Sequence, residues 1–164
     1  MRVIHPFPPL VGADSRALIL GSFPSERSRA EGFFYGHPQN RFWRVLAAVY
    51  GADAPQSVAE KRDFILSRRL ALWDVIAECD IEGSADASIG GVVPNDIGKL
   101  MRDAPITRVF TNGGTAFRLY KKYILPDTGA AASRLPSTSS ANAGWSAERM
   151  IEAWRVVASE GNQS

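Results

Sequence analysis

The sequence has little of what a metal site, a disulfide framework or a membrane span requires. It contains one cysteine and two histidines in 164 residues, which excludes an internal disulfide, an iron–sulfur cluster and a typical zinc site. We therefore expect a reducing compartment and no metal or other cofactor. No run of about 18 apolar residues occurs, and the proline-broken start "MRVIHPFPPLVG" is unlike a signal peptide. A cytoplasmic protein without a membrane partner is expected.

Neither positive nor negative charge is in large excess in the sequence. Nineteen Lys and Arg residues against seventeen Asp and Glu residues give a net charge of +2, which is too small to predict a nucleic-acid partner by itself. The chain is 45% hydrophobic and 22% charged, as is typical of an ordinary globular domain. We expect a monomer with one domain over residues 1–160 and a disordered tail over residues 161–164.

Apolar runs rich in strand-forming residues alternate with helical patterns along the chain. Strands are predicted at 16–24, 71–76, 107–113 and the start of 132–146, and helices at 40–51, 57–70, 94–105, 115–124 and 147–159. This alternation predicts an α/β fold with three α/β/α layers and a central four-stranded, mainly parallel sheet. Ligands bind such folds at the carboxyl ends of the strands. The loops that follow the strands, including residues 76–84, are therefore the predicted site.

One loop stands out because it mixes aromatic and polar residues. Residues 32–43 read "GFFYGHPQNRFW". The buried face of a helix offers no partners to His37, Asn40 and Arg41, so the segment predicts a pocket that stacks on a flat, polar group. Phe42 and Trp43 begin an apolar helical stripe and are interpreted as core.

Several motifs occur in a recognisable order. "GSFPS" (21–25), "FFYGHPQNRFW" (33–43) and "LPSTSSANAG" (135–144) resemble the motifs of the uracil DNA glycosylase superfamily, especially its hypoxanthine-DNA (deoxyinosine) glycosylase branch. "LWDV", "GGVVPND" and "FTNGGTAF" extend the resemblance over most of residues 17–146. The mismatch-specific uracil branch has an asparagine where this chain has Phe23. The resemblance therefore leaves Asn40 as the residue that positions water.

The resemblance implies a monofunctional enzyme that hydrolyses the N-glycosidic bond of a damaged base flipped out of double-stranded DNA. Such a reaction needs a placed water, hydrogen bonds to the departing base and exclusion of bulk water. Asn40 is the predicted catalytic residue. The other predicted site residues are the base-binding Phe23, Phe34, Tyr35, His37 and Asn112, with Phe33 as a further candidate for the stacking wall, and the DNA-binding Arg134, Ser137, Thr138, Ser139, Ala141 and Asn142. Related enzymes carry a bulky wedge in this last loop where this chain has Ala141.

Purely structural roles remain open for three of these features. His37 could bond a loop carbonyl, and Asn112 could cap the following helix, where asparagine is favoured. Ser137 to Ser140 could form an ordinary turn.

Alternative functions also remain open. Hypoxanthine is the predicted base, with mismatched uracil or thymine as the alternative. A non-catalytic nucleic-acid-binding module is disfavoured, because such a module would place Lys or Arg where "PQNRF" has an asparagine. A hydrolase triad of Ser22, His37 and Asp74 is disfavoured because "GSFPS" is not the G-x-S-x-G elbow. Asp74 alone is left open between a general base and a capping or ion-paired role.

Overall fold

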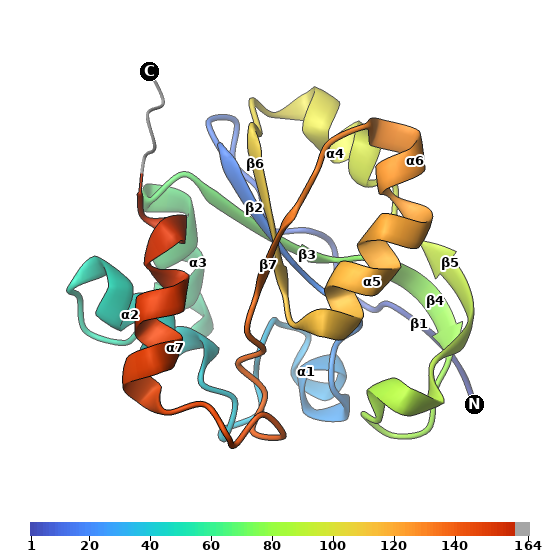
Figure 1. Ribbon diagram of the computed structural model, residues 1–164, viewed down its shortest axis with the longest axis horizontal. Coiled ribbons are helices and arrows are strands. Elements are labelled where there is room, and N and C mark those ends of the chain that lie inside the picture. Colours follow the sequence, from blue (N-terminus) through green and yellow to red (C-terminus); the bar gives the residue numbers. More distant parts are fainter. Residues whose placement is uncertain (160–164) are drawn as a thin grey trace.

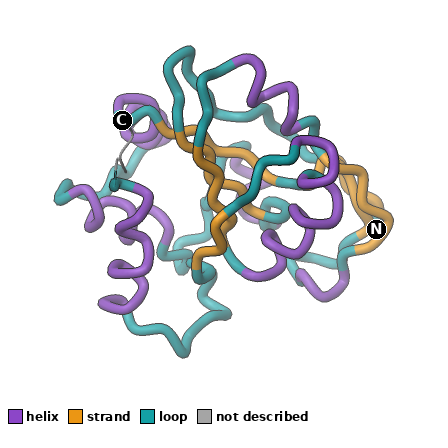
Figure 2. Tube along the Cα trace, turned by 45° about the horizontal axis from the view of Figure 1, so that its top comes forward, coloured by secondary structure: helices purple, strands orange, loops and turns teal. Residues whose placement is uncertain are grey.

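Four parallel strands in the order β3-β2-β6-β7 form the centre of the structure, a computed structural model that describes residues 1–159. Helices cover both faces of this sheet, as Figures 1 and 2 show. The predicted α/β fold with three layers and a four-stranded parallel sheet is confirmed. The strands of the sheet are β2 (Ala17–Gly21), β3 (Leu70–Asp74), β6 (Arg108–Asn112) and β7 (Ser133–Leu135).

The two faces of the sheet bury different helices. All five residues of β2 are buried, as expected for a strand that is covered on both sides. Because side chains alternate along a strand, Ile19 joins one apolar cluster, and Leu18 and Leu20 join the other. The first cluster includes α2 (Phe42–Tyr50), α3 (Val58–Ser67) and α7 (Ala147–Trp154), and the second includes α4 (Ile97–Asp103), α5 (Gly114–Tyr123) and residues beside α6 (Leu125–Thr128).

Helix α2 begins where the unusual aromatic segment ends. Its buried residues include Phe42, Val45, Leu46 and Val49, so the predicted apolar stripe is present. The helix ends at Gly51, whose φ of 64° suits glycine. Phe42 and Trp43 are 0% and 6% exposed, which confirms that they belong to the core.

The structure adds elements that the sequence did not predict. A second, antiparallel sheet has the order β1-β4-β5, and strand β4 replaces part of the loop predicted at 76–84. Its strands were missed because β1 has three residues and β5 begins with two glycines, so neither carries a strong local signal. A polar helix, α1, also follows β2. The additional elements are β1 (Arg2–Ile4), α1 (Glu26–Glu31), β4 (Ile76–Asp80), β5 (Gly90–Pro94), α6 (Leu125–Thr128) and the 3₁₀ helices η1 (Asp86–Ser88) and η2 (Arg155–Val157). Helix η2 replaces the end of the helix predicted at 147–159.

Two further expectations concern the ends and the surroundings of the chain. Among residues 1–159, no helix is long and apolar enough to cross a membrane. The tail predicted at 161–164 and residue 160 of the predicted domain lie outside the described residues.

Candidate active site

A cleft of about 800 Å³ opens at the carboxyl ends of β2, β3 and β6. In Figure 1 this is the lower edge of the sheet, where α1 and the loop after β7 lie. The cleft is therefore where the sequence predicts it. The predicted site residues that line it are Phe23, Phe34, Tyr35, His37, Asn40, Asn112, Ser137, Thr138, Ser139 and Ala141.

Two asparagines from distant parts of the chain are joined through one threonine. The hydroxyl of Thr138 donates to Asn40 Oδ1 at 2.8 Å and accepts from Asn112 Nδ2 at 3.0 Å. The backbone N–H of Thr138 donates to Asn112 Oδ1 at 3.0 Å. Thr138 is fully buried, so its hydroxyl orients both amides and does not face a phosphate.

The amide of Asn40 has one end occupied and one end available. Its Oδ1 accepts from the N–H of Phe42 at 2.9 Å as well as from Thr138, and these two donors fix which end is oxygen. Among the described residues, Nδ2 has no hydrogen-bond partner. Asn40 therefore presents a donor to the cleft, whereas its acceptor is used within the protein.

Asn112 does not cap the next helix. Helix α5 begins after Gly113, and no side chain bonds its first amides. The capping alternative is therefore wrong, because the side chain of Asn112 turns across the cleft to Thr138. This leaves the amide rigidly oriented at the wall of the cleft.

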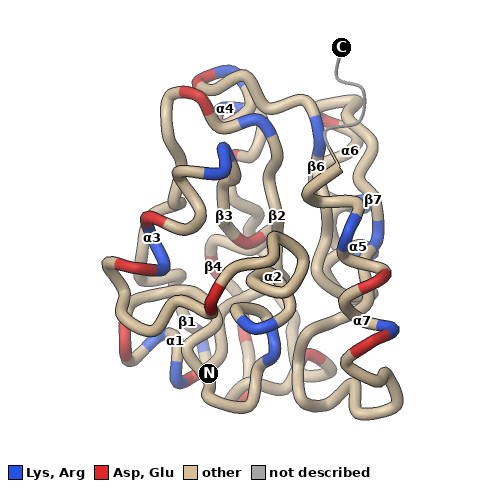
Figure 3. The backbone as a smooth tube through the Cα atoms, turned by 90° about the vertical axis from the view of Figure 1, so that its left-hand side faces the viewer, with Lys and Arg blue, Asp and Glu red and all other residues tan. Residues whose placement is uncertain are grey.

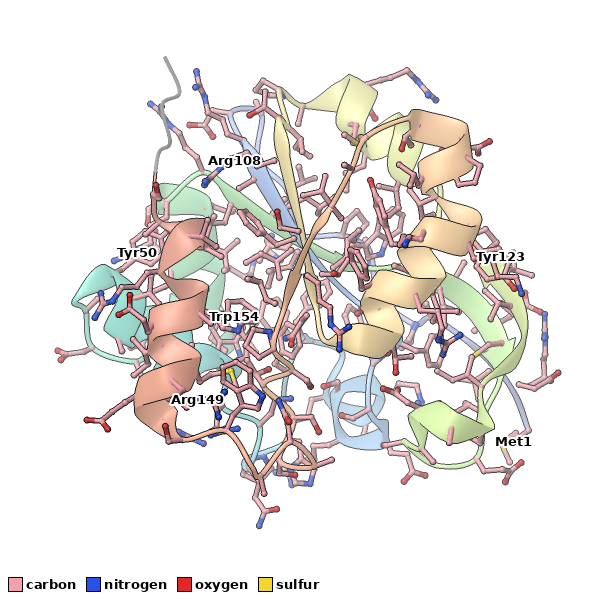
Figure 4. The ribbon with its side chains drawn as sticks, viewed as in Figure 1. Met1, Tyr50, Arg108, Tyr123, Arg149 and Trp154 are labelled. Carbon is pink, nitrogen blue, oxygen red and sulfur yellow. The ribbon has the colours of Figure 1, made fainter. Side chains whose placement is uncertain are left out.

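The loop after β7 is tied to the start of α2 by Arg41. The guanidinium of Arg41 donates to the carbonyls of Trp145 and Asn142 at 2.8 and 3.1 Å, and its backbone N–H donates to the carbonyl of Thr138 at 2.9 Å. Trp154, which points from α7 toward the sheet in Figure 4, donates to the carbonyl of Pro136 at 3.0 Å. Sequence reasoning missed this clamp, because its partners lie about a hundred residues from Arg41.

The serine-rich part of this loop is a turn that also borders the cleft. Ser137 Oγ accepts from the N–H of Ser139, and Ser139 Oγ accepts from the N–H of Ala141. The interpretation as a turn is thus confirmed. Asn142 has a structural part in the turn, since its Nδ2 donates to the carbonyl of Ser137.

The predicted aromatic wall divides into exposed and buried rings. Phe23 is half-buried and meets His5 edge to face at 5.9 Å, whereas Phe34 is 3% exposed and packs against Phe7. Phe33 stacks on Trp43 and does not line the cleft, so its predicted place in the stacking wall is wrong. Phe23 is therefore more accessible to a ligand than Phe34.

Tyr35 is held in an unfavourable conformation. Its φ is 52°, a region that bulky side chains rarely adopt, and its ring stacks on Phe42 with centroids 4.0 Å apart. Its hydroxyl is buried without a hydrogen-bond partner among the described residues. Burial raises the pKa of this phenol strongly, the charge of Asp74 raises it further, and the nearby Asn112 amide opposes the rise. Tyr35 is thus a neutral donor at the cleft.

Asp74 is paired with a histidine that sequence reasoning did not place in the site. His5 Nε2 lies 2.7 Å from Asp74 Oδ2, and the two side chains are 3% and 6% exposed. The N–H of Phe7 donates to His5 Nδ1 at 3.4 Å, which leaves Nε2 as the protonated nitrogen. Asp74 is thus hydrogen-bonded to His5, and it also lines the cleft.

The alternative Ser22, His37, Asp74 triad is not assembled. Ser22 donates to Asp86 at 3.3 Å, and Asp74 bonds His5. His37 is exposed at the mouth of the cleft, where its Nδ1 accepts from the N–H of Gln39. It therefore bonds a backbone N–H and not the loop carbonyl of the structural alternative.

A groove of about 660 Å³ adjoins the cleft and is bordered by Arg134, Ser137, Ser139, Ala141 and Asn142. Arg134 has no ion-pair or hydrogen-bond partner within residues 1–159, and its Nη2 lies 2.8 Å from where a Cβ of Gly114 would stand. The arginine thus lies over the N-terminus of α5. Elsewhere, Figure 3 shows basic and acidic positions interspersed along the backbone.

Within the described part of the chain, no three His, Cys, Asp or Glu residues are grouped so that they could hold a metal ion. The cleft presents oriented amides, a phenol, a carboxylate and aromatic rings.

Comparison with known proteins places this cleft in a family. Residues 8–158 match the family model described as the uracil DNA glycosylase superfamily. Two proteins named hypoxanthine DNA glycosylase are 34% identical to the chain: the Methanosarcina acetivorans protein over 92% of this chain and 95% of its own, and the Methanosarcina barkeri protein over 83% and 86%. A solution structure titled as a candidate uracil DNA glycosylase from Methanosarcina acetivorans covers 96% of this chain and 97% of its own, with 32% identity and a TM-score of 0.81. The chain belongs to the uracil DNA glycosylase superfamily.

Proposed function

We propose that this protein is a monofunctional DNA glycosylase that acts as a monomer and hydrolyses the N-glycosidic bond of hypoxanthine flipped out of double-stranded DNA. The observation that carries the proposal is the bonded set Asn40, Thr138 and Asn112, which fixes two amides at the wall of one cleft. Two relatives named hypoxanthine DNA glycosylase support the choice of base.

Asn40 is the proposed catalytic residue. Positive charge develops on the sugar as the base departs, so the enzyme must hold a water where it can attack. The free Nδ2 of Asn40 can donate to the oxygen of that water while a second lone pair of the oxygen faces the sugar. A neutral amide suffices for this task, because the departure of the base creates most of the electrophile. The proton that the attacking water loses balances the negative charge of the departing base, which leaves as the protonated free base.

The loop after β7 is the proposed grip on the DNA backbone. Ser137 and Ser139 border both the cleft and the groove that holds Arg134. Their hydroxyl oxygens accept from backbone N–H groups of the turn, so the hydroxyl protons can donate to phosphate oxygens. Thr138 takes part through the orientation of Asn40 and Asn112. Ala141 is too small to fill the space that a flipped base leaves. The protein would therefore leave most of this gap in the DNA base stack unfilled.

A direct test is excision from duplexes that carry one altered base, namely hypoxanthine, uracil, xanthine or a mismatched thymine, followed by alkaline cleavage. Hypoxanthine should be released fastest. Fastest release of uracil or thymine would instead favour the mismatch-specific alternative; of these two bases, the family description names uracil. Binding of all duplexes without any excision would overturn the proposed activity.

The variant Asn40→Ala tests the catalytic assignment. It should lower the single-turnover rate by at least about 100-fold while affinity for the lesion duplex stays nearly unchanged, since the lost interaction matters in the transition state. Gln39→Ala is the matched control, because Gln39 is the exposed neighbour of Asn40. A fully active, folded Asn40→Ala protein would contradict this mechanism.

Asn112 is proposed to face the edge of the base. Asn112→Ala should therefore change the ratio of the rates on hypoxanthine and uracil as well as the rates themselves, because a polar wall of a pocket discriminates by leaving partners unpaired. Equal losses on both bases would assign Asn112 to the support of Thr138 alone.

A further inference from the structure

The buried hydroxyl of Tyr35 is a polar group that the protein itself leaves unsatisfied. Among the described residues it has no hydrogen-bond partner, although most buried hydroxyls have one. The backbone at Tyr35 adopts a positive φ of 52°, and the stack on Phe42 holds the ring in place. Strain combined with an unpaired donor is typical of a group kept ready for a ligand.

A second oxygen meets this hydroxyl at the end of β2. A Cβ at Gly21 would lie 2.5 Å from Asp74 Oδ1 and 3.2 Å from the hydroxyl of Tyr35. The two oxygens therefore lie close together over the backbone of Gly21, and all three residues line the cleft. Glycine is required at position 21, because any side chain there would collide with the carboxylate.

The carboxylate of Asp74 is oriented by a hydrogen bond to His5. Asp74 Oδ2 is bound to His5 Nε2 at 2.7 Å, while Oδ1 has no donor within the described chain. The N–H of Phe7 holds His5 Nδ1, so the imidazole acts as a fixed donor. The remaining oxygen of Asp74 is thus an acceptor directed at the cleft, beside a phenol that is a donor.

A donor beside an acceptor matches a ligand that presents an acceptor beside a donor. The lactam edge of hypoxanthine has this order, with the carbonyl O6 next to N1–H. Adenine has the reverse order, with an amino group next to a bare ring nitrogen, and would leave both protein groups facing the wrong partner. Uracil carries a lactam edge as well, whereas cytosine carries the reversed one.

Resting on the proposed glycosylase activity, we infer that Tyr35 and Asp74 form the element that recognises a deaminated base. Tyr35 donates to the carbonyl oxygen of the lactam, Asp74 Oδ1 accepts from its N–H, and His5 positions Asp74. The pair distinguishes hypoxanthine from adenine and uracil from cytosine. Guanine and thymine carry the same lactam edge, so their rejection and the choice among deaminated bases are left to other parts of the cleft.

The test compares Tyr35→Phe and Asp74→Asn with the unmodified protein in single-turnover excision. On a hypoxanthine duplex, each variant should be about 10- to 100-fold slower, because a hydrogen bond to the base is lost. On a duplex with unsubstituted purine at the same position, which lacks both O6 and N1–H, the loss should shrink to less than about threefold. For Asp74→Asn, the loss of rate on the unsubstituted-purine duplex should become a gain if the new amide donates to the bare ring nitrogen N1. Tyr123→Phe, remote on α5 in Figure 4, is the control.

Affinity for a duplex with a tetrahydrofuran abasic site should be the same for all proteins, since no base is present, and this also shows that each variant is folded. An equal loss on hypoxanthine and on unsubstituted purine would overturn the recognition role. The recognition role would also be overturned if both variants excised hypoxanthine at rates within about threefold of the unmodified protein. If the unmodified protein excises neither hypoxanthine nor uracil, the proposed glycosylase activity itself fails, which is a separate outcome.

Discussion

At the scale of single residues, Thr138 shows how one small side chain can control two functional groups. Its hydroxyl is the bridge between Asn40 and Asn112, so Thr138→Val would keep the shape and remove the bridge. The excision rate should fall by about 10- to 100-fold, and the free energy of unfolding by about 1–3 kcal/mol, because buried amide groups lose a partner. Single-turnover kinetics and urea unfolding measure the two effects.

The control for Thr138→Val is Thr111→Val. Thr111 is also fully buried, and its hydroxyl makes only a long bond of 3.4 Å to the carbonyl of Ser133. Its replacement should leave the excision rate unchanged. If Thr138→Val retained full activity, the Phe42 N–H alone would be sufficient to orient Asn40.

The residues of the site were more predictable than their connections. Asn40 and Asn112 could be placed in the site from the sequence, because each lies within a recognisable motif at a helix start or a strand end. The bridge through Thr138 spans 98 residues to Asn40, and the pair of His5 with Asp74 spans 69. Such contacts arise only when the sheet assembles, so no local sequence pattern predicts them.

At the scale of elements, the same division applies. Helices α2 and α7 carry amphipathic patterns and were predicted within a few residues of their observed ends, apart from the final 3₁₀ turn. The antiparallel sheet was missed because β1 pairs with β4, more than 70 residues later, and strand pairing at that distance depends on tertiary packing. The missed sheet matters for the site, since the chain leaving β1 places His5 behind Asp74.

The N-terminus of α5 supplies a prediction about DNA binding. Arg134 lies over this terminus in the groove beside the cleft, where a phosphate would meet both the guanidinium and the exposed amides of the helix. Arg134→Gln should weaken binding to all duplexes alike and reduce the slope of log affinity against log salt by about 1. Lys122→Gln, an exposed lysine near the other end of α5, is the control and should leave the slope unchanged.

At the scale of the whole molecule, the small net charge limits how strongly salt can act. A net charge of +2 with interspersed acidic and basic positions predicts a shallow overall salt dependence, with fewer than about eight counterions released. Titration of a lesion duplex at several salt concentrations gives this number. A slope corresponding to eight or more would contradict the inference that neutral donors of the loop after β7 provide most of the grip.

The pH dependence of stability is the other property of the whole molecule. Burial raises the pKa of Tyr35 and of Tyr120 above the ordinary value of 10.0, and it raises the pKa of the Cys79 thiol above 9.0. A raised pKa in the folded state means that the fold favours the protonated form. The resulting stability is fully present below the ordinary value and is lost as the pH rises toward the folded-state value.

The free energy of unfolding should therefore decline above about pH 10 as unfolded tyrosines begin to ionise. Because the phenol of Tyr35 is buried beside Asp74, Tyr35→Phe should flatten the decline. Urea unfolding at about pH 8 and about pH 11 measures the difference for each protein. The comparison with the unmodified chain cancels the contributions of Tyr120 and Cys79, which both proteins share. An identical decline in Tyr35→Phe would contradict this prediction. It would mean that the Tyr35 phenol ionises as easily in the folded protein as in the unfolded chain, despite its burial beside a carboxylate.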